Sequence, residues 1–577
     1  MPGLRHAALV LAALCSTAAP AQPGFTFAQV NAEAAARAGT ERSLSTHLLR
    51  AREAARRGLV HPRHVTRDSG GRFQVAIRTD FAGADLSEGL RAAGAAVTFQ
   101  EMGSGYVEAW VSPERLHAVA SVPGVNFLRP ILPAVPRTGA VLSEGDAFHQ
   151  ANAARFYLDI AGGGVKVGLI TTGVRGLAGA QAFGDLPLVL DNQIPTGVPA
   201  NTDGDGTALL EIMRDVAPDI RMAYAVAITP GNYMQCLTNL RNAGCDIIVD
   251  HLGFYAEPFF EDGMLAQALD QAAADGFHVV SAAGNDGQNH WEGPYVDVDP
   301  LTGVGVSDDF HAFAPNDPYL AITIRPQTVC TVVLQWSDPF GASATDYNLY
   351  LYDGPVQNLL DSSLDIQDGN DDPFEFVQFY NTTNADQLGQ IAIDKVNPLQ
   401  PDRRLEFFVI GSPLSGEVSI GSVTIDEPAV PAGSIIGQAA ARSAITVAAL
   451  DVTAPPMNVI EPFSSRGPSV IEHASAETRL KPNVSAADRV SITTGSGEPI
   501  PFLGTSAAAA HTVGIMALLL ELNPALDPQE MKDTLEASCY DILLPGYDTT
   551  SGAGRLDALL AILSVPLSGA EDWTMYR

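Results

Sequence analysis

A serine that opens a long apolar helix is the first feature of this sequence that could do chemistry. Gly504-Thr505-Ser506 leads directly into AAAAHTVGIMALLLEL, small and then large apolar residues. At such a helix start a serine hydroxyl is exposed, and the serine N–H points outward with the positive end of the helix dipole. A serine nucleophile and half of an oxyanion hole require these two groups. An ordinary serine N-cap would give the same pattern.

An asparagine just past a buried strand offers the other half of an oxyanion hole. The segment HVVSAAGNDG places Asn285 after an apolar run, among small residues that leave room for a substrate. A side-chain amide at this place can donate to an oxyanion, which typically lowers a barrier by about 3 kcal/mol. Alone, Asn-Asp-Gly would indicate only a turn. Ser506 and Asn285 together favour acyl transfer.

The surrounding residues predict the elements that position this pair. Over 146–295 continuous apolar runs alternate with helical segments, and the same alternation returns over 430–565. This is typical of an α/β fold with a parallel sheet covered by helices. Over 296–429 helical patterns nearly vanish, and short strands separated by turn residues predict an inserted all-β sandwich. We expect the two ends of this insertion to lie close together, so that it can be removed.

The N-terminal part of the chain predicts a targeting segment and a small separate domain. Residues 1–21 have a basic start, an apolar run and Ala19-Pro20-Ala21, the pattern of a secretory signal peptide. Over about 72–130 the order of strands and helices is β-α-β-β-α-β, which predicts a ferredoxin-like domain. A proline-bearing linker follows it up to Gly145. We therefore expect a secreted protein, extracellular or periplasmic.

Composition narrows the classes of partner. The 577 residues carry 33 Lys and Arg against 66 Asp and Glu, a net charge of -33. Nucleic acids and anionic membranes require a basic face, so we expect neither as a partner. The longest apolar run after the signal segment, 507–520, is too short to span a bilayer, which predicts no membrane insertion. We expect a monomer.

Metal and disulfide signals are weak. The cysteines after the signal segment are even in number and show no zinc spacing, and Cys236 is close enough in sequence to bridge to Cys245. We predict no metal ligand among the site residues and no certain cofactor. An acidic stretch of the sandwich could hold Ca²⁺ or form a solvated loop; its members are Asp361, Asp365, Asp368, Asp371 and Asp372.

Taken together, these stretches resemble the subtilase superfamily of serine peptidases. The matching stretches occur in the family's order: VKVGLI, DGDGTALLEI, DIIVDHLGF, SAAGNDG, SAITVAAL, FSSRGP, RLKPNVSA, GTSAAAAH and SGAGRLDA. The resemblance implies a subtilisin-like core that hydrolyses peptide bonds through an acyl-enzyme on Ser506. It also implies substrate binding by Gly253 and Gly284, a polypeptide substrate, and a propeptide, residues 22–145, that acts as the chain's own inhibitor.

Two positions of the family's Ser-His-Asp triad depart from the pattern. The aspartate normally lies in I-D-T-G, where this chain has Thr171, and the histidine normally opens H-G-T-H, where it has Asp205. Asp205 resembles the acidic residue that the related sedolisins use, and it is an acid/base candidate or a helix N-cap. His251, aligned with the S-L-G stretch of the cleft, is the other candidate base, or a residue that fills the cleft wall.

The sequence therefore predicts a secreted, subtilisin-like serine endopeptidase. The first alternative is a catalytically inactive subtilase that binds a peptide through the same cleft. A further alternative makes the inserted sandwich the functional part, a module that binds a glycan or a surface, with the core as its scaffold.

Overall fold

The computed structural model describes residues 43–57, 65–79, 85–101, 103–131, 135–136, 143–200, 202–298, 309–414, 420–427, 429–493 and 500–565. The expected signal peptide over 1–21 lies outside the described residues, as does most of the linker before Gly145.

The core is a nine-stranded sheet in which the central strands run parallel. Its order is β27-β28-β24-β21-β11-β9-β6-β8-β7. The central strands are apolar because both of their faces are covered. They are β6 (Lys166–Thr171), β8 (Arg221–Val226), β9 (Ile247–Asp250), β11 (His278–Ala282), β21 (Ile445–Asp451) and β24 (Val484–Asp488). The short outer strands are β7 (Asp191–Asn192), β28 (Arg555–Leu556) and the antiparallel β27 (Cys539–Tyr540).

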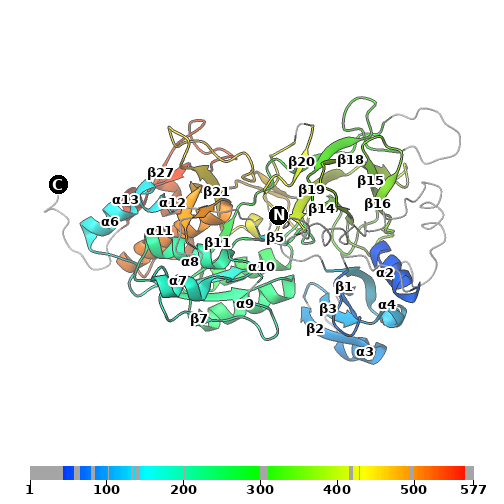
Figure 1. The fold of residues 1–577 in the computed structure, drawn as a ribbon, viewed down its shortest axis with the longest axis horizontal. Coiled ribbons are helices and arrows are strands. Elements are labelled where there is room, and N and C mark those ends of the chain that lie inside the picture. The colour runs from blue at the N-terminus through cyan, green and yellow to red at the C-terminus, as the bar shows by residue number, and fades with distance from the viewer. Residues whose placement is uncertain are drawn as a thin grey trace, which may run out of the picture.

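Helices cover both faces of this sheet (Figure 1). On one face lie α9 (Pro230–Asn242) and α10 (Met264–Ala274). On the other lie α8 (Asp205–Val216) and the central α11 (Thr505–Leu522), joined by α6 (Ala151–Leu158), α12 (Pro528–Ala537) and α13 (Ala558–Ser564).

Helix α11 has the length and apolar composition of a membrane span, but 89% of it is buried within the protein. Its residues belong to the largest apolar cluster of the core, in contact with α8 and with the strands β21 and β24. We therefore interpret α11 as the core helix of this sheet.

The N-terminal domain is a four-stranded antiparallel sheet in the order β2-β3-β1-β4. The strands are β1 (Phe73–Thr79), β2 (Ala95–Glu101), β3 (Tyr106–Val111) and β4 (Val125–Pro130), with helices α3 (Ser87–Ala93) and α4 (Leu116–Ala120) between them. A preceding helix, α2 (Thr46–Arg57), buries Leu48 and Ala51 in the same apolar cluster. The domain therefore begins before residue 72, where the strand pattern starts.

The inserted segment forms two antiparallel sheets that share one apolar core. One sheet has the order β12-β19-β14-β17: β12 (His290–Pro294), β19 (Arg404–Pro413), β14 (Thr328–Trp336) and β17 (Phe374–Asn381). The other has the order β16-β15-β18-β13-β20: β16 (Leu359–Ser363), β15 (Tyr347–Asp353), β18 (Gln387–Lys395), β13 (Leu320–Ile324) and β20 (Val423–Ile425).

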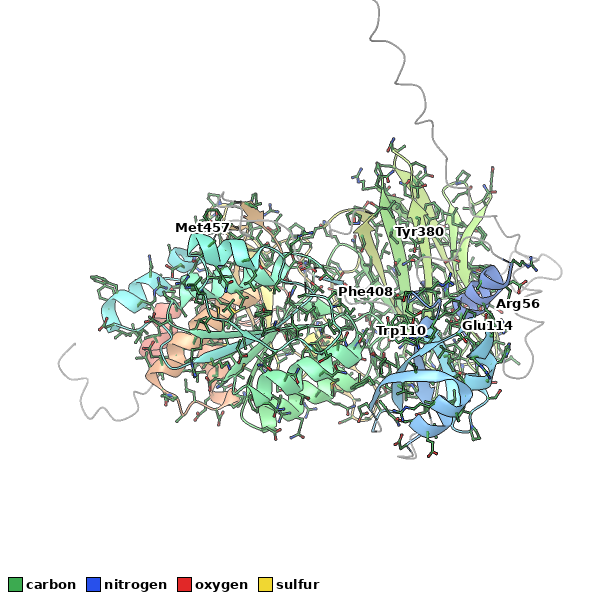
Figure 2. All side chains as sticks on the ribbon, turned by 60° about the horizontal axis from the view of Figure 1, so that its bottom comes forward. Arg56, Trp110, Glu114, Tyr380, Phe408 and Met457 are labelled. Carbon is green, nitrogen blue, oxygen red and sulfur yellow. The ribbon has the colours of Figure 1, made fainter. Side chains whose placement is uncertain are left out.

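The outer face of the first sheet is buried against the core. Phe408 of β19 contacts Phe259 and Tyr255, with ring centroids 5.1 Å and 5.2 Å away, at the junction seen in Figure 2. Although the ends of the insertion lie side by side, with Val430 N donating to His290 O over 3.0 Å, its removal would expose this apolar surface. The prediction that the sandwich can simply be removed is therefore not supported by this apolar interface.

The four cysteines in the described part of the chain are free thiols, so the bridge suggested for Cys236 and Cys245 is not formed. The Cys236 thiol, on α9, instead donates to Val226 O at 3.2 Å.

Candidate active site

The candidate residues gather where neighbouring strands of the core sheet end. β6 ends at Thr171, β9 is followed by His251, and β11 by the loop that carries Asn285. These strands are adjacent and parallel, so their carboxyl ends meet at one edge, the usual place for a site in an α/β sheet. The start of α11, with Ser506, forms hydrogen bonds with the β11 loop there.

Asn285 is fixed by the residue before the candidate nucleophile. Thr505 donates its backbone N–H and its hydroxyl to Oδ1 of Asn285, each over 3.0 Å. The Thr505 hydroxyl in turn accepts from Gly284 N over 3.1 Å. Because Oδ1 is held as an acceptor by the helix, the amide Nδ2 is turned away from it as a donor. Sequence reasoning missed the role of Thr505, although it lies within the GTS stretch.

Ser506 is the second residue of α11 and is fully buried. The helix is preceded by Gly504, whose φ of 134° is a backbone conformation that favours glycine, and whose N–H donates to Asp488 Oδ1 over 2.8 Å. An N–H in the first turn of a helix has no partner within the helix. Ser506 thus combines a hydroxyl and an N–H at the positive end of α11.

Thr171 and His251 form a direct pair. Thr171 Oγ1 and His251 Nε2 are 2.8 Å apart, and both side chains are fully buried. Thr171 therefore contacts an imidazole through a neutral hydroxyl, at the position where the family pattern has a carboxylate. His251 lies beside Asp250, whose carboxylate is turned to other partners, among them Tyr233 OH at 2.9 Å.

Asp205 is the first residue of α8 rather than its N-cap, which is Gly204. Its N–H donates to Asp203 Oδ1 over 3.2 Å. The next residue, Gly206, packs directly on Thr171, because a Cβ there would lie 2.9 Å from Thr171 Oγ1. The start of α8 therefore adjoins Thr171. The N-cap interpretation of Asp205 is wrong by one residue, because the helix begins at Asp205 itself.

Gly253 lies in a short strand that is already paired. β10 (Leu252–Gly253) runs antiparallel to β5 (Val135–Pro136), a part of the linker after the N-terminal domain, with Leu252 opposite Pro136 and Gly253 opposite Val135. An extended peptide that adds to a strand edge binds in this manner. The other predicted substrate-binding residue, Gly284, has a φ of 116°, which favours glycine, and contacts Thr505.

The N-terminal domain docks on α9 through a buried carboxylate. Glu108 of β3 accepts from Gly231 N over 2.8 Å and from Thr229 Oγ1 over 3.0 Å, at the first turn of α9. Burial raises the pKa of the Glu108 carboxyl. A carboxylate at a helix start is stabilised by the unpaired N–H groups and the dipole. No signal in the sequence distinguishes Glu108 from other strand glutamates.

The acidic stretch of the insertion also contacts the N-terminal domain. Three of the five aspartates that we considered for Ca²⁺ bind its side chains: Asp361 pairs with Arg50 at 3.0 Å, Asp365 accepts from Thr46 at 2.6 Å, and Asp372 pairs with Arg78 at 2.9 Å. These carboxylates are therefore part of an interface and not of a freely solvated loop. Ca²⁺ binding stays a prediction.

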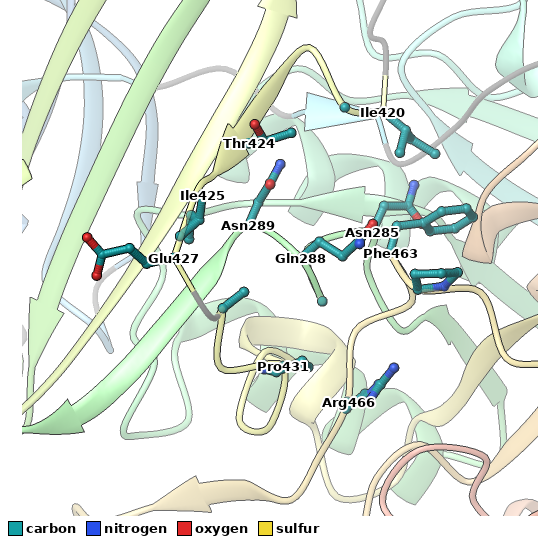
Figure 3. Close-up of a pocket in the computed structure, with 14 residues that line it drawn as sticks. Asn285, Gln288, Asn289, Ile420, Thr424, Ile425, Glu427, Pro431, Phe463 and Arg466 are labelled. Carbon is teal, nitrogen blue, oxygen red and sulfur yellow. The ribbon is translucent and has the colours of Figure 1, made fainter. Parts of the chain in front are cut away.

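A cavity of about 380 Å³ lies between Asn285 and the chain that leaves the insertion (Figure 3). Gln288, Asn289 and Phe463 line it on the core side, and Thr424 and Ile425 on the side of the insertion. It is large enough to hold part of a ligand next to the candidate oxyanion donor.

One family model matches a part of the chain. Residues 418–556, which include Ser506 and all of α11, match the model of the subtilase family, peptidase S8. This match covers about a quarter of the chain and supports the resemblance to the subtilase superfamily found in the sequence.

Two solved structures are similar to the chain. The CspB protease of Clostridium perfringens is 14% identical, with a TM-score of 0.47, over 73% of this chain and 98% of that one. Fervidolysin from Fervidobacterium pennivorans, a keratinolytic enzyme related to subtilisin, is 14% identical, with a TM-score of 0.44, over 88% of this chain and 63% of that one.

Proposed function

We propose that the chain is the precursor of a secreted serine endopeptidase that acts as a monomer on polypeptide substrates. The observation that carries this proposal is the pair of hydrogen bonds from Thr505 to Asn285, which fixes an amide donor beside Ser506. A protein that only used the fold as a scaffold would not need a donor held in this way next to a helix-start serine.

In the proposed reaction Ser506 Oγ attacks the carbonyl carbon of the scissile bond while its proton passes to a base. Asn285 Nδ2 and the Ser506 N–H donate to the oxyanion of the tetrahedral intermediate. The C–N bond then breaks, and the amine leaves with the proton. Water hydrolyses the acyl-enzyme by the same steps in reverse order.

The base is one of two residues. Asp205 lies at the start of α8, and His251 offers an imidazole, the side chain that most often serves as a general base. The hydroxyl of Thr171 can orient His251 over 2.8 Å but supplies no negative charge to an imidazolium. We therefore expect slow turnover, since a neutral replacement for the triad carboxylate can cost about 10⁴-fold in kcat.

The N-terminal domain is proposed as the inhibitor. The pairing of Val135–Pro136 with Leu252–Gly253 puts the linker on the strand that the resemblance assigns to substrate, and Glu108 anchors the domain on α9. The burial of Ser506 is consistent with this closed state.

The alternative is an inactive subtilase that binds a peptide along Leu252–Gly253. The specific observation in its favour is the neutral Thr171–His251 pair in place of a charged one. In this alternative the strand still binds a peptide, but Ser506 does not act as a nucleophile.

Self-processing of the full chain tests the proposal. Purified wild-type precursor should cut itself between residues 130 and 145, whereas Ser506→Ala should stay full length. Ser564→Ala, an exposed serine at the end of α13, is the matched control and should behave as wild type. Wild-type precursor that stays full length and hydrolyses no denatured protein would support the inactive alternative.

A further inference from the structure

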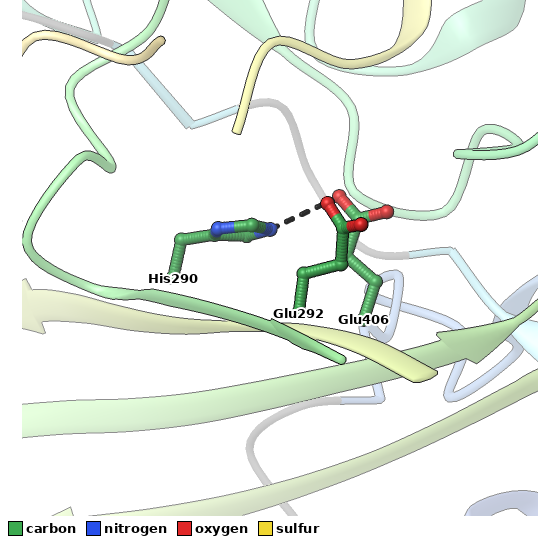
Figure 4. A group of neighbouring side chains, drawn as sticks. All are labelled: His290, Glu292 and Glu406. Carbon is green, nitrogen blue, oxygen red and sulfur yellow. Dashed lines mark hydrogen bonds and ion pairs between the residues drawn. The ribbon is translucent and has the colours of Figure 1, made fainter. Parts of the chain in front are cut away.

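Three side chains with metal-binding groups meet where the chain enters the insertion. His290 and Glu292 lie two residues apart on β12 and so share one face of the strand, and Glu406 of β19 is directly opposite Glu292. One potential ligand atom from each of the three lies within 4.8 Å of the others (Figure 4). His290 and Glu406 are buried.

The hydrogen bond on the far side of the ring fixes the tautomer of His290. Its Nδ1 lies 2.5 Å from the carbonyl oxygen of Val430, which can only accept, so Nδ1 carries the proton. In a neutral imidazole Nε2 then carries a lone pair, and it faces Glu406 Oε1 at 3.2 Å. Two acceptors that face each other in a buried place require either a proton or a metal ion between them. A backbone carbonyl behind the ring is the usual support of a metal-bound histidine.

We propose that His290 Nε2, Glu292 and Glu406 bind a divalent transition-metal ion of the Zn²⁺ type. An imidazole with two carboxylates suits Zn²⁺ or Mn²⁺ better than Ca²⁺ or Mg²⁺, which prefer oxygen ligands alone. Ligand atoms about 2.0 to 2.2 Å from Zn²⁺ lie about 3.3 Å from one another, so small side-chain rotations close the site. Three protein ligands leave a fourth position for water.

The neighbours of Glu292 fit this arrangement. Arg404 forms an ion pair with Oε1 of Glu292, which neutralises one of the two facing carboxylates and leaves Oε2 for the ion. Gly433 makes room for that second oxygen, since a Cβ at this position would lie 1.8 Å from Oε2.

A shared proton is the competing explanation for the contact between His290 and Glu406. Burial raises the pKa of Glu406 to about 8, so a protonated carboxyl could donate to Nε2. The two explanations differ in the effect of Glu406→Gln. A glutamine amide can replace a protonated carboxyl as a donor to Nε2, but it is a much poorer metal ligand.

The place of the site gives the ion a structural role. The two strands β12 and β19 belong to the insertion, and Val430, which binds His290, lies where the chain returns to the core. An ion here would hold the entry and the exit of the insertion together, five residues from Asn285. This proposal does not depend on peptidase activity.

Metal content and thermal unfolding of the full chain test it. Protein freed of metal with a chelator and then dialysed against Zn²⁺ should retain about one equivalent, and Zn²⁺ should raise its Tm while Mg²⁺ does not. Glu406→Gln should lower the affinity for Zn²⁺ at least about tenfold. Glu472→Gln, which also contacts Arg404, is the control and should bind as wild type.

The proposal is overturned if wild-type protein retains no Zn²⁺ or Mn²⁺ and neither ion changes its Tm. It is also overturned if Glu406→Gln binds Zn²⁺ as tightly as wild type. If Glu406→Gln does not fold, Glu292→Gln provides the same comparison of affinities.

Discussion

Thr505 donates both its N–H and its hydroxyl to Oδ1 of Asn285, each over 3.0 Å. The two residues are far apart in sequence, and the contact joins the start of α11 to the end of β11. It gives the asparagine one orientation before any substrate arrives, which is what preorganised stabilisation of an oxyanion requires.

Loss of the amide should therefore reduce turnover more than binding. Asn285→Ala should lower kcat by about 10²- to 10³-fold with a small change in KM, because the lost donor acts mainly in the transition state. Asn152→Ala, an exposed change on α6, is the control and should leave kcat near that of wild type. Equal kcat for both variants would argue against an oxyanion role for Asn285.

The identity of the base can be read from pH–rate profiles. If His251 is the base, kcat/KM should fall below about pH 6.5, and His251→Ala should cost at least about a hundredfold. If Asp205 is the base, kcat/KM should be retained below about pH 6.5, and Asp205→Asn should be the substitution that lowers it. Near-normal turnover by His251→Ala at every pH would exclude the histidine.

Docking of the N-terminal domain should depend on Glu108 and on pH. Glu108→Gln weakens its bonds to Gly231 N and Thr229 OH, so amide hydrogen exchange in the first turn of α9 should increase. Burial raises the pKa of Glu108 in the docked domain; if undocking exposes this carboxyl, the docked form binds protons more tightly, and docking should weaken as pH rises. Glu114→Gln, an exposed change in the same domain, should leave the exchange unchanged. Exchange that is insensitive to Glu108→Gln would refute this role.

Buried neutral histidines should make the core sensitive to acid. His149 donates from Nδ1 to Leu556 O and accepts at Nε2 from Ala487 N, and its pKa is lowered to about 3, chiefly by burial. The unfolded chain takes up this proton near pH 6.5, so the stability is present above that pH and is lost as pH falls toward about 3.

Urea unfolding between pH 7 and pH 5 measures this effect. For this histidine the free energy of unfolding should fall by about 2 kcal/mol in total between pH 7 and pH 5, and the slope should approach about 1.4 kcal/mol per pH unit only well below pH 6.5. His149→Asn should make the dependence shallower. An unchanged slope in the variant would show that His149 does not set it.

The sequence predicted the core well because its strands are continuous apolar runs and because GTSAAAAH, AAGN and FSSRGP are specific stretches. It predicted Ser506 and Asn285, and the structure brings them to one edge through Thr505. It could not predict Glu108, the acidic interface or the cluster at His290, because these contacts join residues more than a hundred positions apart. Strand pattern alone also could not show that one face of the insertion is buried on the core.

Covalent labelling of Ser506 tests the central claim most directly. The mature protein should react with a fluorophosphonate probe, and peptide mapping should locate the adduct on Ser506, with no labelling of Ser506→Ala. Asn285→Ala should be labelled more slowly, because the phosphonyl oxygen is held in the oxyanion hole. Labelling that survives in Ser506→Ala, or mature wild-type protein that does not react at any pH, would contradict the assignment of Ser506 as the nucleophile.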